Sequence, residues 1–194
     1  MRVKLQRLII GLLIGGMLIC PVLATSTFPD VGEDALYAEA VEYINETGIM
    51  VGDENGNFNP NKTLTRAEIA TILCRVLQET ENLAVTSVFS DVPSNHWANR
   101  YIGRAAELGI VSGYGDGKYG PSDDLTYEQA ITMIVRTIYG NAEGEAAGGY
   151  PDGFLSIASE NGLLNNVFTN KGESILRSDV ATILFNYYNI SVSG

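Results

Sequence analysis

The hydrophobic pattern of the chain predicts short amphipathic helices that come in pairs. In the first pair, one apolar stripe at helical spacing consists of Leu36, Ala40, Val41 and Ile44. A second stripe, spaced i, i+3, i+4, i+7 and i+8, consists of Ile69, Ile72, Leu73, Val76 and Leu77. Between the stripes, Gly48 stands where a left-handed cap would end a helix, and residues 52–60 are rich in turn-forming Gly, Asp, Asn and Pro. The pattern therefore predicts helix, turn, helix.

The starts of the second helices carry a recognisable signal. Thr65 is followed three residues later by Glu68, which is a capping box, and Thr126 is followed by Gln129 in the same way. A third stripe, which includes Val180 and Leu184, is preceded by Leu176 where the other two stripes have Thr. We expect this third helix to start with a different cap or to fray.

The helix pair is repeated along the chain with a period of 61 residues. Phe28-Pro29-Asp30-Val31 recurs as Phe89-Ser90-Asp91-Val92, and Tyr150-Pro151-Asp152 recurs once more. The same offset relates the glycines, the Pro and the Leu-Thr of the turns, which indicates true repeats. We predict repeat one at residues 28–77, repeat two at 89–140 and a shortened, degenerate repeat three at 150–190.

A helix pair cannot bury both of its apolar stripes alone, so the three repeats are expected to share one core. The sequence therefore predicts an all-α fold in which residues 25–194 form a single module. The joints, Gln78 to Val88 and Gly140 to Gly149, have the composition of flexible surface linkers.

The first residues resemble a targeting signal. Three basic residues lie before an uncharged apolar run from Leu8 to Cys20, which Pro21 ends shortly before Ala24. This arrangement is typical of a secretory signal peptide, here residues 1–24, and the run is short for a membrane span. We expect a cleaved, secreted protein, with an uncleaved anchor as the alternative.

Charge excludes several classes of partner and site. The 194 residues hold 12 Lys and Arg against 23 Asp and Glu, a net charge of −11. Nucleic acid binding requires clustered positive charge, so it is not expected.

One His excludes a multi-His metal site, and the Asp53-x-Asn55-x-Asn57 sequence lacks the Gly and Glu of an EF-hand loop. We therefore predict no metal and no cofactor.

Several motifs together resemble S-layer homology (SLH) repeats. They are the recurring Phe-x-Asp-Val, the His96-Trp97-Ala98 segment, the Asp-Gly-x-aromatic-x-Pro turn and Leu64-Thr65-Arg66-Ala67-Glu68. The resemblance covers residue 28 to about residue 190. It implies a helical module with a pseudo-threefold arrangement that binds secondary cell wall polysaccharide noncovalently, often through pyruvate ketals, and anchors the protein at the bacterial cell surface.

The resemblance also implies candidate ligand residues. Arg66 matches the family's arginine for the acidic ligand, at a first helical position where free N–H groups and the helix dipole favour anions. Arg177 aligns with it, whereas repeat two has Tyr127 there. Trp97 matches an aromatic residue that could stack on a sugar, with Leu36 in its place in repeat one. The candidate set also includes Thr65, and Asp30 and Asp91, which match a family aspartate together with Asp152 and could instead serve as helix caps.

Two other classes of function remain open. The same fold could bind another protein, for example as a structural S-layer component. A wall glycosidase would need two carboxylates, and 23 acids always supply a pair, so this signal is unspecific. We expect no catalysis, with wall polysaccharide and other surface proteins as partners.

Overall fold

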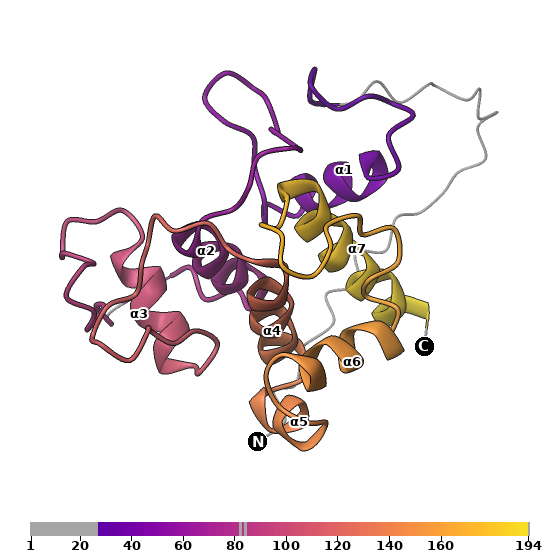
Figure 1. Cartoon of the computed structure of the whole chain (residues 1–194). Coiled ribbons are helices and arrows are strands. Elements are labelled where there is room, and N and C mark those ends of the chain that lie inside the picture. Colours follow the sequence, from indigo (N-terminus) through magenta and orange to yellow (C-terminus); the bar gives the residue numbers. More distant parts are fainter. Residues whose placement is uncertain (1–26, 82, 84, 194) are drawn as a thin grey trace.

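The computed structural model describes residues 27–81, 83 and 85–193, and the predicted signal peptide lies outside this range. Its helices are α1 (Ala38–Glu46), α2 (Arg66–Val76), α3 (Asn99–Glu107), α4 (Tyr127–Ile138), α5 (Asn141–Ala146), α6 (Asp152–Glu160) and α7 (Arg177–Ser193) (Figure 1). In this part of the chain, β-type pairing is limited to three isolated bridges, which confirms the all-α prediction. None of the described helices is both long enough and apolar enough to cross a bilayer.

The predicted stripes form the core, with one exception. Val41, Ile44, Ile69 and Leu73 are all fully buried, and Gly48 ends α1 with a φ of 72°. Both capping boxes are present, at Thr65 and at Thr126. Leu36 was wrongly placed in the first stripe: α1 begins only at Ala38, so Leu36 precedes the helix and is 69% exposed.

Three buried residues close a ring at the centre of the molecule. The N–H of Leu64 donates to the carbonyl of Ile175 at 3.2 Å, that of Ile175 to Leu125 at 2.9 Å, and that of Leu125 to Leu64 at 2.8 Å. Each of the three residues lies just before the second helix of a predicted repeat, and each side chain is fully buried. The ring gives the module its pseudo-threefold arrangement.

Helix packing follows the same cyclic order. The second helix of each predicted repeat packs against the first helix of the next, α2 against α3 and α4 against α6. The last helix, α7, packs against the first, α1, and the two lie side by side in Figure 1. No predicted repeat is therefore complete without a neighbour, because the partner of each second helix belongs to another repeat.

The helix starts are capped by the neighbouring segment. The N–H of Arg66 donates to the carbonyl of Asp123 at 3.0 Å, that of Tyr127 to Glu173 at 2.9 Å and that of Arg177 to Lys62 at 3.0 Å. At α7, the N–H of Ser178 also donates to the carbonyl of Pro60. Equivalent backbone contacts occur at α2, which also has its capping box, so α7 differs from α2 in lacking the side-chain cap that Leu176 cannot provide.

One predicted linker is wrong in its central part. Residues 141–146 of the joint 140–149 form α5, which packs against α4 and α6. Gly144 of α5 is buried, and a Cβ atom there would lie 2.0 Å from Cε1 of the fully buried Phe154. The glycine thus permits close packing, although in the sequence it contributed to a linker-like composition.

Candidate functional site

Two grooves lie between neighbouring segments of the ring. The first groove, about 280 Å³, is lined by Arg66, Ser112, Gly113, Tyr114, Gln129, Thr132, Met133, Arg136 and Tyr150. The second groove, about 140 Å³, is lined by Met50, Val51, Glu68, Thr71, Ile72, Arg75, Trp97 and Arg177. A larger hollow of about 600 Å³ lies around Tyr139, Tyr187 and Tyr188 and contains none of the predicted ligand residues.

The two grooves occupy equivalent positions in the repeats. The offset of 61 residues maps Glu68 onto Gln129, Thr71 onto Thr132 and Arg75 onto Arg136. Each groove also receives one arginine from the first residue of the preceding segment's second helix, which is Arg66 in the first groove and Arg177 in the second. Each groove thus contains two arginines and is completed by a residue of the remaining segment, Tyr150 in the first groove and Trp97 in the second.

Arg66 is held firmly at the base of the first groove. Its side chain is only 3% exposed. Nε donates to the carbonyl of Tyr119 at 2.7 Å, and Nη2 donates to the carbonyl of Ser112 at 2.8 Å. The guanidinium carbon lies 4.7 Å from the ring centre of Tyr114 and 4.5 Å from that of Tyr119, so cation–π attraction adds to the hydrogen bonds.

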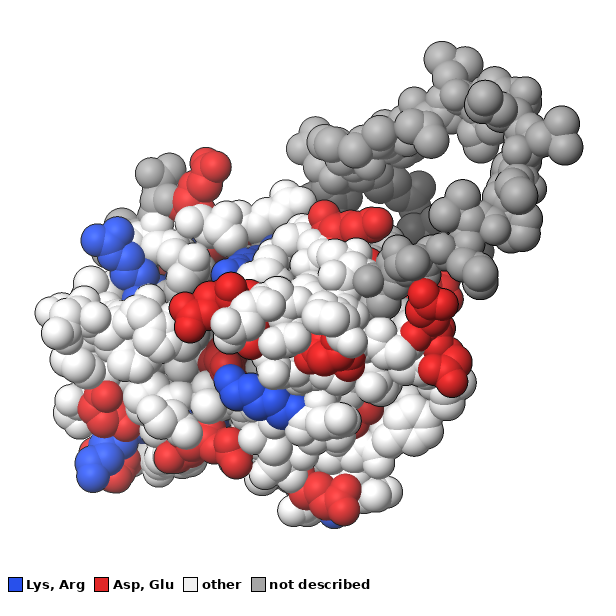
Figure 2. All heavy atoms as spheres, turned by 90° about the horizontal axis from the view of Figure 1, so that it is seen from above, with Lys and Arg blue, Asp and Glu red and all other residues white. Residues whose placement is uncertain are grey.

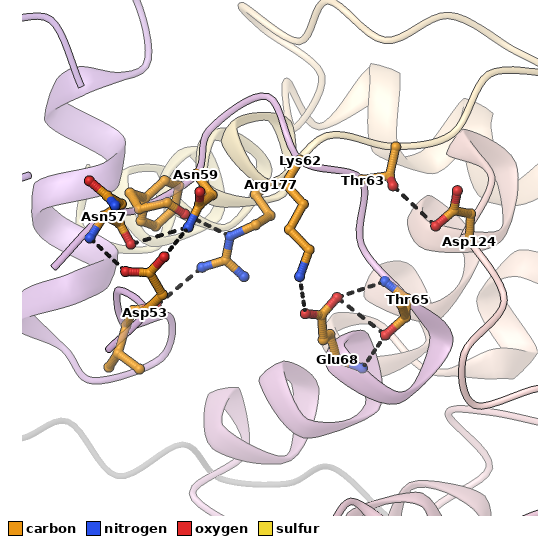
Figure 3. Close-up of polar contacts among 11 residues, drawn as sticks. Asp53, Asn57, Asn59, Lys62, Thr63, Thr65, Glu68, Asp124 and Arg177 are labelled. Atoms are coloured by element: carbon orange, nitrogen blue, oxygen red, sulfur yellow. Dashed lines mark hydrogen bonds and ion pairs between the residues drawn. The ribbon is translucent and has the colours of Figure 1, made fainter. Parts of the chain in front are cut away.

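Arg177 repeats this geometry in the second groove. Nε donates to the carbonyl of Phe58 at 2.9 Å and Nη2 to that of Val51 at 3.1 Å, and the guanidinium lies 4.9 Å from the ring centre of Phe58. Figure 3 shows the side chain reaching across to the loop that carries Asn57 and Asn59. Burial lowers the pKa of Arg177, but an arginine remains charged at neutral pH.

The groove arginines are unusual in their charge environment. Acidic side chains are spread over the face shown in Figure 2 and outnumber the Lys and Arg side chains there. Nevertheless, Arg66, Arg75, Arg136 and Arg177 form no ion pair with a carboxylate of the described chain. In the first groove, no lining residue is acidic. Both grooves can therefore attract an anion, the first more strongly than the second, which includes Glu68.

Exposed aromatic rings stand beside the arginines. In the second groove, Trp97 is 61% exposed and stacks on His96 with ring centres 5.8 Å apart. In the first groove, Tyr114 and Tyr150 are also more than half exposed. An apolar ring face next to a cation suits a ligand that has both a flat apolar face and an acid group.

The corresponding position between segments two and three has no arginine. Tyr127 takes the place of Arg66, as the sequence indicated, and Asn186 takes the place of Arg75 and Arg136. Nδ2 of Asn186 donates to the carbonyls of Leu163 at 2.9 Å and Asn165 at 2.8 Å. At this position an uncharged amide therefore bonds the backbone carbonyls, whereas in the two grooves the equivalent backbone faces charged arginines.

The predicted aspartates bind backbone rather than line a groove. The carboxylate of Asp30 accepts from the N–H groups of Phe58 and Asn59 at 2.8 and 2.7 Å, and Asp91 accepts from Tyr119 and Gly120 at the same distances. Burial acts to raise the pKa of Asp91, but the two N–H groups outweigh it and the pKa is lowered. These residues fix the turns that carry Phe58 and Tyr119.

Asp152 and Thr65 also have structural partners. Asp152 starts α6 and forms an ion pair with Lys171 at 3.0 Å. Thr65 is the N-cap of α2: its N–H donates to Glu68 at 2.8 Å, and its hydroxyl accepts from the N–H of Glu68 at 3.3 Å. Neither residue lines either of the two grooves. The structure thus brings Arg177 and Trp97 together and places Arg66 in the other groove.

The helix N-terminus does not act as the sequence suggested. Arg66 is indeed the first residue of α2, but the N–H groups of Arg66 and Ala67 donate to the carbonyls of Asp123 and Pro121, both at 3.0 Å. The N–H of Glu68 donates to the hydroxyl of Thr65, so these three backbone donors are already occupied. The first N–H groups of α2 are therefore not available to an anion in the groove.

The sequence alone did not predict Arg75 and Arg136 on the opposite walls, nor the aromatic residues Tyr114 and Tyr150. The two arginines share the 61-residue offset, so the repeat comparison itself contained their signal. Tyr114 corresponds to Asp53, and no periodicity distinguishes it. Tyr150 reaches the first groove from the next segment, which only the folded ring reveals.

The fold and the paired grooves define a helical repeat module. Residues 27–70 and 88–131 match the family model of the S-layer homology domain. Two segments of the chain therefore match the S-layer homology domain, and they contain α1 with the start of α2, and α3 with the start of α4.

Relatives of the chain are cell-surface proteins. It is 34% identical over 165 residues to a cell surface protein of Thermoanaerobacter kivui, covering 83% of this chain and 21% of the relative. It is 31% identical over 172 residues to the middle cell wall protein of Brevibacillus brevis, covering 87% of this chain and 16% of the relative. A cellulosome-anchoring protein of Acetivibrio thermocellus is 28% identical over 116 residues, covering 58% of this chain and 26% of the relative.

The chain thus spans only about a fifth of the length of the first of these relatives. The family match and the relatives place it at the cell surface or in the cell wall, as predicted. They also indicate a surface domain of the non-catalytic class.

Proposed function

We propose that the chain binds secondary cell wall polysaccharide noncovalently and so anchors at the bacterial cell surface. The observation that carries this proposal is the pair of grooves whose four arginines form no ion pair within the described residues of an otherwise acidic protein. A glycan substituted with pyruvate ketals presents a carboxylate on a sugar ring. Its carboxylate suits the arginines, and the sugar face suits the exposed aromatic rings.

The proposal assigns different roles to the predicted ligand residues. Arg66, Arg177 and Trp97 contact the ligand, since they line the grooves. Asp30, Asp91 and Thr65 act indirectly: the aspartates hold the turns whose carbonyls orient the two arginines, and Thr65 fixes the start of α2. The net charge repels an acidic polymer at long range, but salt screens this repulsion beyond roughly 10 Å, so local arginines can still bind.

We also propose that residues 150–190 are a shortened third repeat within one module spanning residues 25–194, preceded by a signal peptide at 1–24. Three features support a third repeat: Ile175 completes the central ring, α7 packs against α1, and Arg177 repeats the geometry of Arg66. The alignment with the Thermoanaerobacter protein also extends beyond residue 131, since it covers 83% of the chain.

Replacing Arg136 tests the proposal better than replacing Arg66. Arg66→Ala would leave two carbonyls without donors and weaken the fold itself. Arg136 is half-buried at the groove wall and donates through Nε to Asn141 at 2.8 Å. We expect Arg136→Gln to weaken co-sedimentation of residues 25–194 with Gram-positive wall sacculi about tenfold, a loss of about 1.4 kcal/mol that is typical of one charged hydrogen bond.

The matched control is Arg100→Gln, which removes the same charge from an exposed position that lines neither groove. It should bind as the unchanged protein does. Sacculi stripped of secondary polysaccharide by acid should bind neither protein. Equal binding to stripped and intact walls would contradict a polysaccharide ligand and point to a protein partner in the wall.

A further inference from the structure

One wall of the first groove consists of three polar residues of α4. Gln129, Thr132 and Arg136 are spaced three and four residues apart, so they lie along one face of the helix. Their counterparts in the second groove are Glu68, Thr71 and Arg75 of α2. The two triads have the same positions but use their hydrogen-bonding groups differently.

On α2, the polar groups are bound to the protein. Glu68 accepts from Lys62 at 2.9 Å and from the N–H of Thr65 at 2.8 Å (Figure 3). The hydroxyl of Thr71 donates to the carbonyl of Ala67 at 3.0 Å, and Nη1 of Arg75 donates to the carbonyl of Ile49 at 3.2 Å. Only Arg75 retains unused donors, at Nε and Nη2.

On α4, the corresponding groups retain unused donors. Thr132 is 3% exposed, and its hydroxyl has no hydrogen-bond partner within the described residues, unlike those of Thr71 and Thr182. Gln129 accepts from the N–H of Thr126 at 3.2 Å, whereas its amide NH₂ bonds no described group. Arg136 donates through Nε, which leaves both Nη groups available. A buried hydroxyl without a partner is unfavourable, and a ligand could relieve this cost.

We infer that Gln129, Thr132 and Arg136 form a specificity strip, in which Arg136 binds the acid group of the glycan while Thr132 and Gln129 bind its hydroxyl or acetamido groups. This inference rests on the proposed function and deepens it. The first groove is then the tighter and more selective of the two sites. In the second groove, α2 has fewer unused donors, and its Glu68 carboxylate repels an acidic ligand.

Matched valine substitutions test the strip. The probe is the soluble secondary polysaccharide released by acid from Gram-positive sacculi, titrated calorimetrically into residues 25–194. We expect Thr132→Val to weaken binding about tenfold and Thr71→Val less than twofold. Without ligand, Thr132→Val should melt at the same or a higher temperature, since it removes an unpaired buried hydroxyl, whereas Thr71→Val should melt lower because it loses a hydrogen bond.

A second variant tests the charge of the strip without threatening the fold. Gln129→Glu replaces the Thr–Gln capping box of α4 with the Thr–Glu box that α2 has, so the variant should fold normally. Its carboxylate should weaken binding of the acidic glycan at least tenfold. Unchanged binding by both Thr132→Val and Gln129→Glu, or equal losses in Thr132→Val and Thr71→Val, would overturn the strip alone. Failure of the unchanged protein to bind would overturn the proposed function and the strip together.

Discussion

Single side chains in this module often bond backbone groups that lie far away in the sequence. Asp91 is an example: its two N–H partners, Tyr119 and Gly120, lie 28 and 29 residues further along the chain. The repeated Phe-x-Asp-Val motif revealed that Asp91 matters, but a local motif contains no information about a distant donor. The sequence therefore suggested a helix cap or a ligand, and only the fold identified the turn as its partner.

The carboxylate of Asp91 should make stability depend on pH. Its pKa is lowered in the folded protein, so its stabilising effect is present above the unfolded value of about 3.9 and is lost as the pH falls through the folded pKa. Glu68 also has a lowered pKa, as burial is outweighed by the N–H of Thr65 and by Lys62. We expect the melting temperature to fall when the pH is lowered from about 5 to 3.

Asp91→Asn should lower stability at pH 7 by about 1–3 kcal/mol and flatten this acid dependence, because two charge-assisted hydrogen bonds are weakened. Thermal melts between pH 3 and 7 measure both effects. The control is Asp34→Asn, an exposed carboxylate away from the turns that carry Phe58 and Tyr119, which should change neither. A variant at Asp91 that keeps the acid dependence of the unchanged protein would assign that dependence to other carboxylates.

At the scale of elements, local signals predicted the helices that begin with a capping box. The boxes at Thr65 and Thr126 involve residues three apart, so both partners are visible in the sequence. α5 was missed because its position depends on the contact of Gly144 with Phe154, ten residues away. α7 has no capping box, and its first N–H groups are capped by carbonyls of residues 60 and 62.

The close contact at α5 can be tested directly. Gly144→Ala should lower stability by about 1–3 kcal/mol, because its Cβ would clash with the buried ring of Phe154, and this exceeds the helix propensity gained from alanine. Chemical denaturation measures the change. Glu143→Ala on the exposed side of the same helix should be close to neutral. A stabilised Gly144→Ala would mean that α5 can move away from Phe154 at little cost.

At the scale of the whole molecule, periodicity predicted the repeats and their shared core. It did not predict which segments build a groove, because that depends on how the ring closes. Arg177 and Phe58 are 119 residues apart in the chain and meet only because α7 packs against α1. The second groove therefore combines Trp97 and Arg177, which the sequence placed in separate repeats.

Removing residues 150–194 should unfold the remainder. The truncation takes away α7, which covers α1, and Ile175, which accepts from the N–H of Leu64 in the central ring. Two repeats alone would expose an apolar face. We expect no cooperative thermal transition by circular dichroism, whereas the protein from residue 25 to 194 should melt cooperatively. A cooperative melt of the truncated protein would show that two repeats form a stable unit.

The pairing of α1 with α7 has a consequence for the order of events when the protein is made. α1 is synthesised before its packing partner α7, so the ring cannot close until the chain has been made as far as α7. Contacts between residues far apart in sequence also slow folding. A protein that acts at the cell surface must cross the membrane beforehand, and a chain that folds late stays extended enough for export.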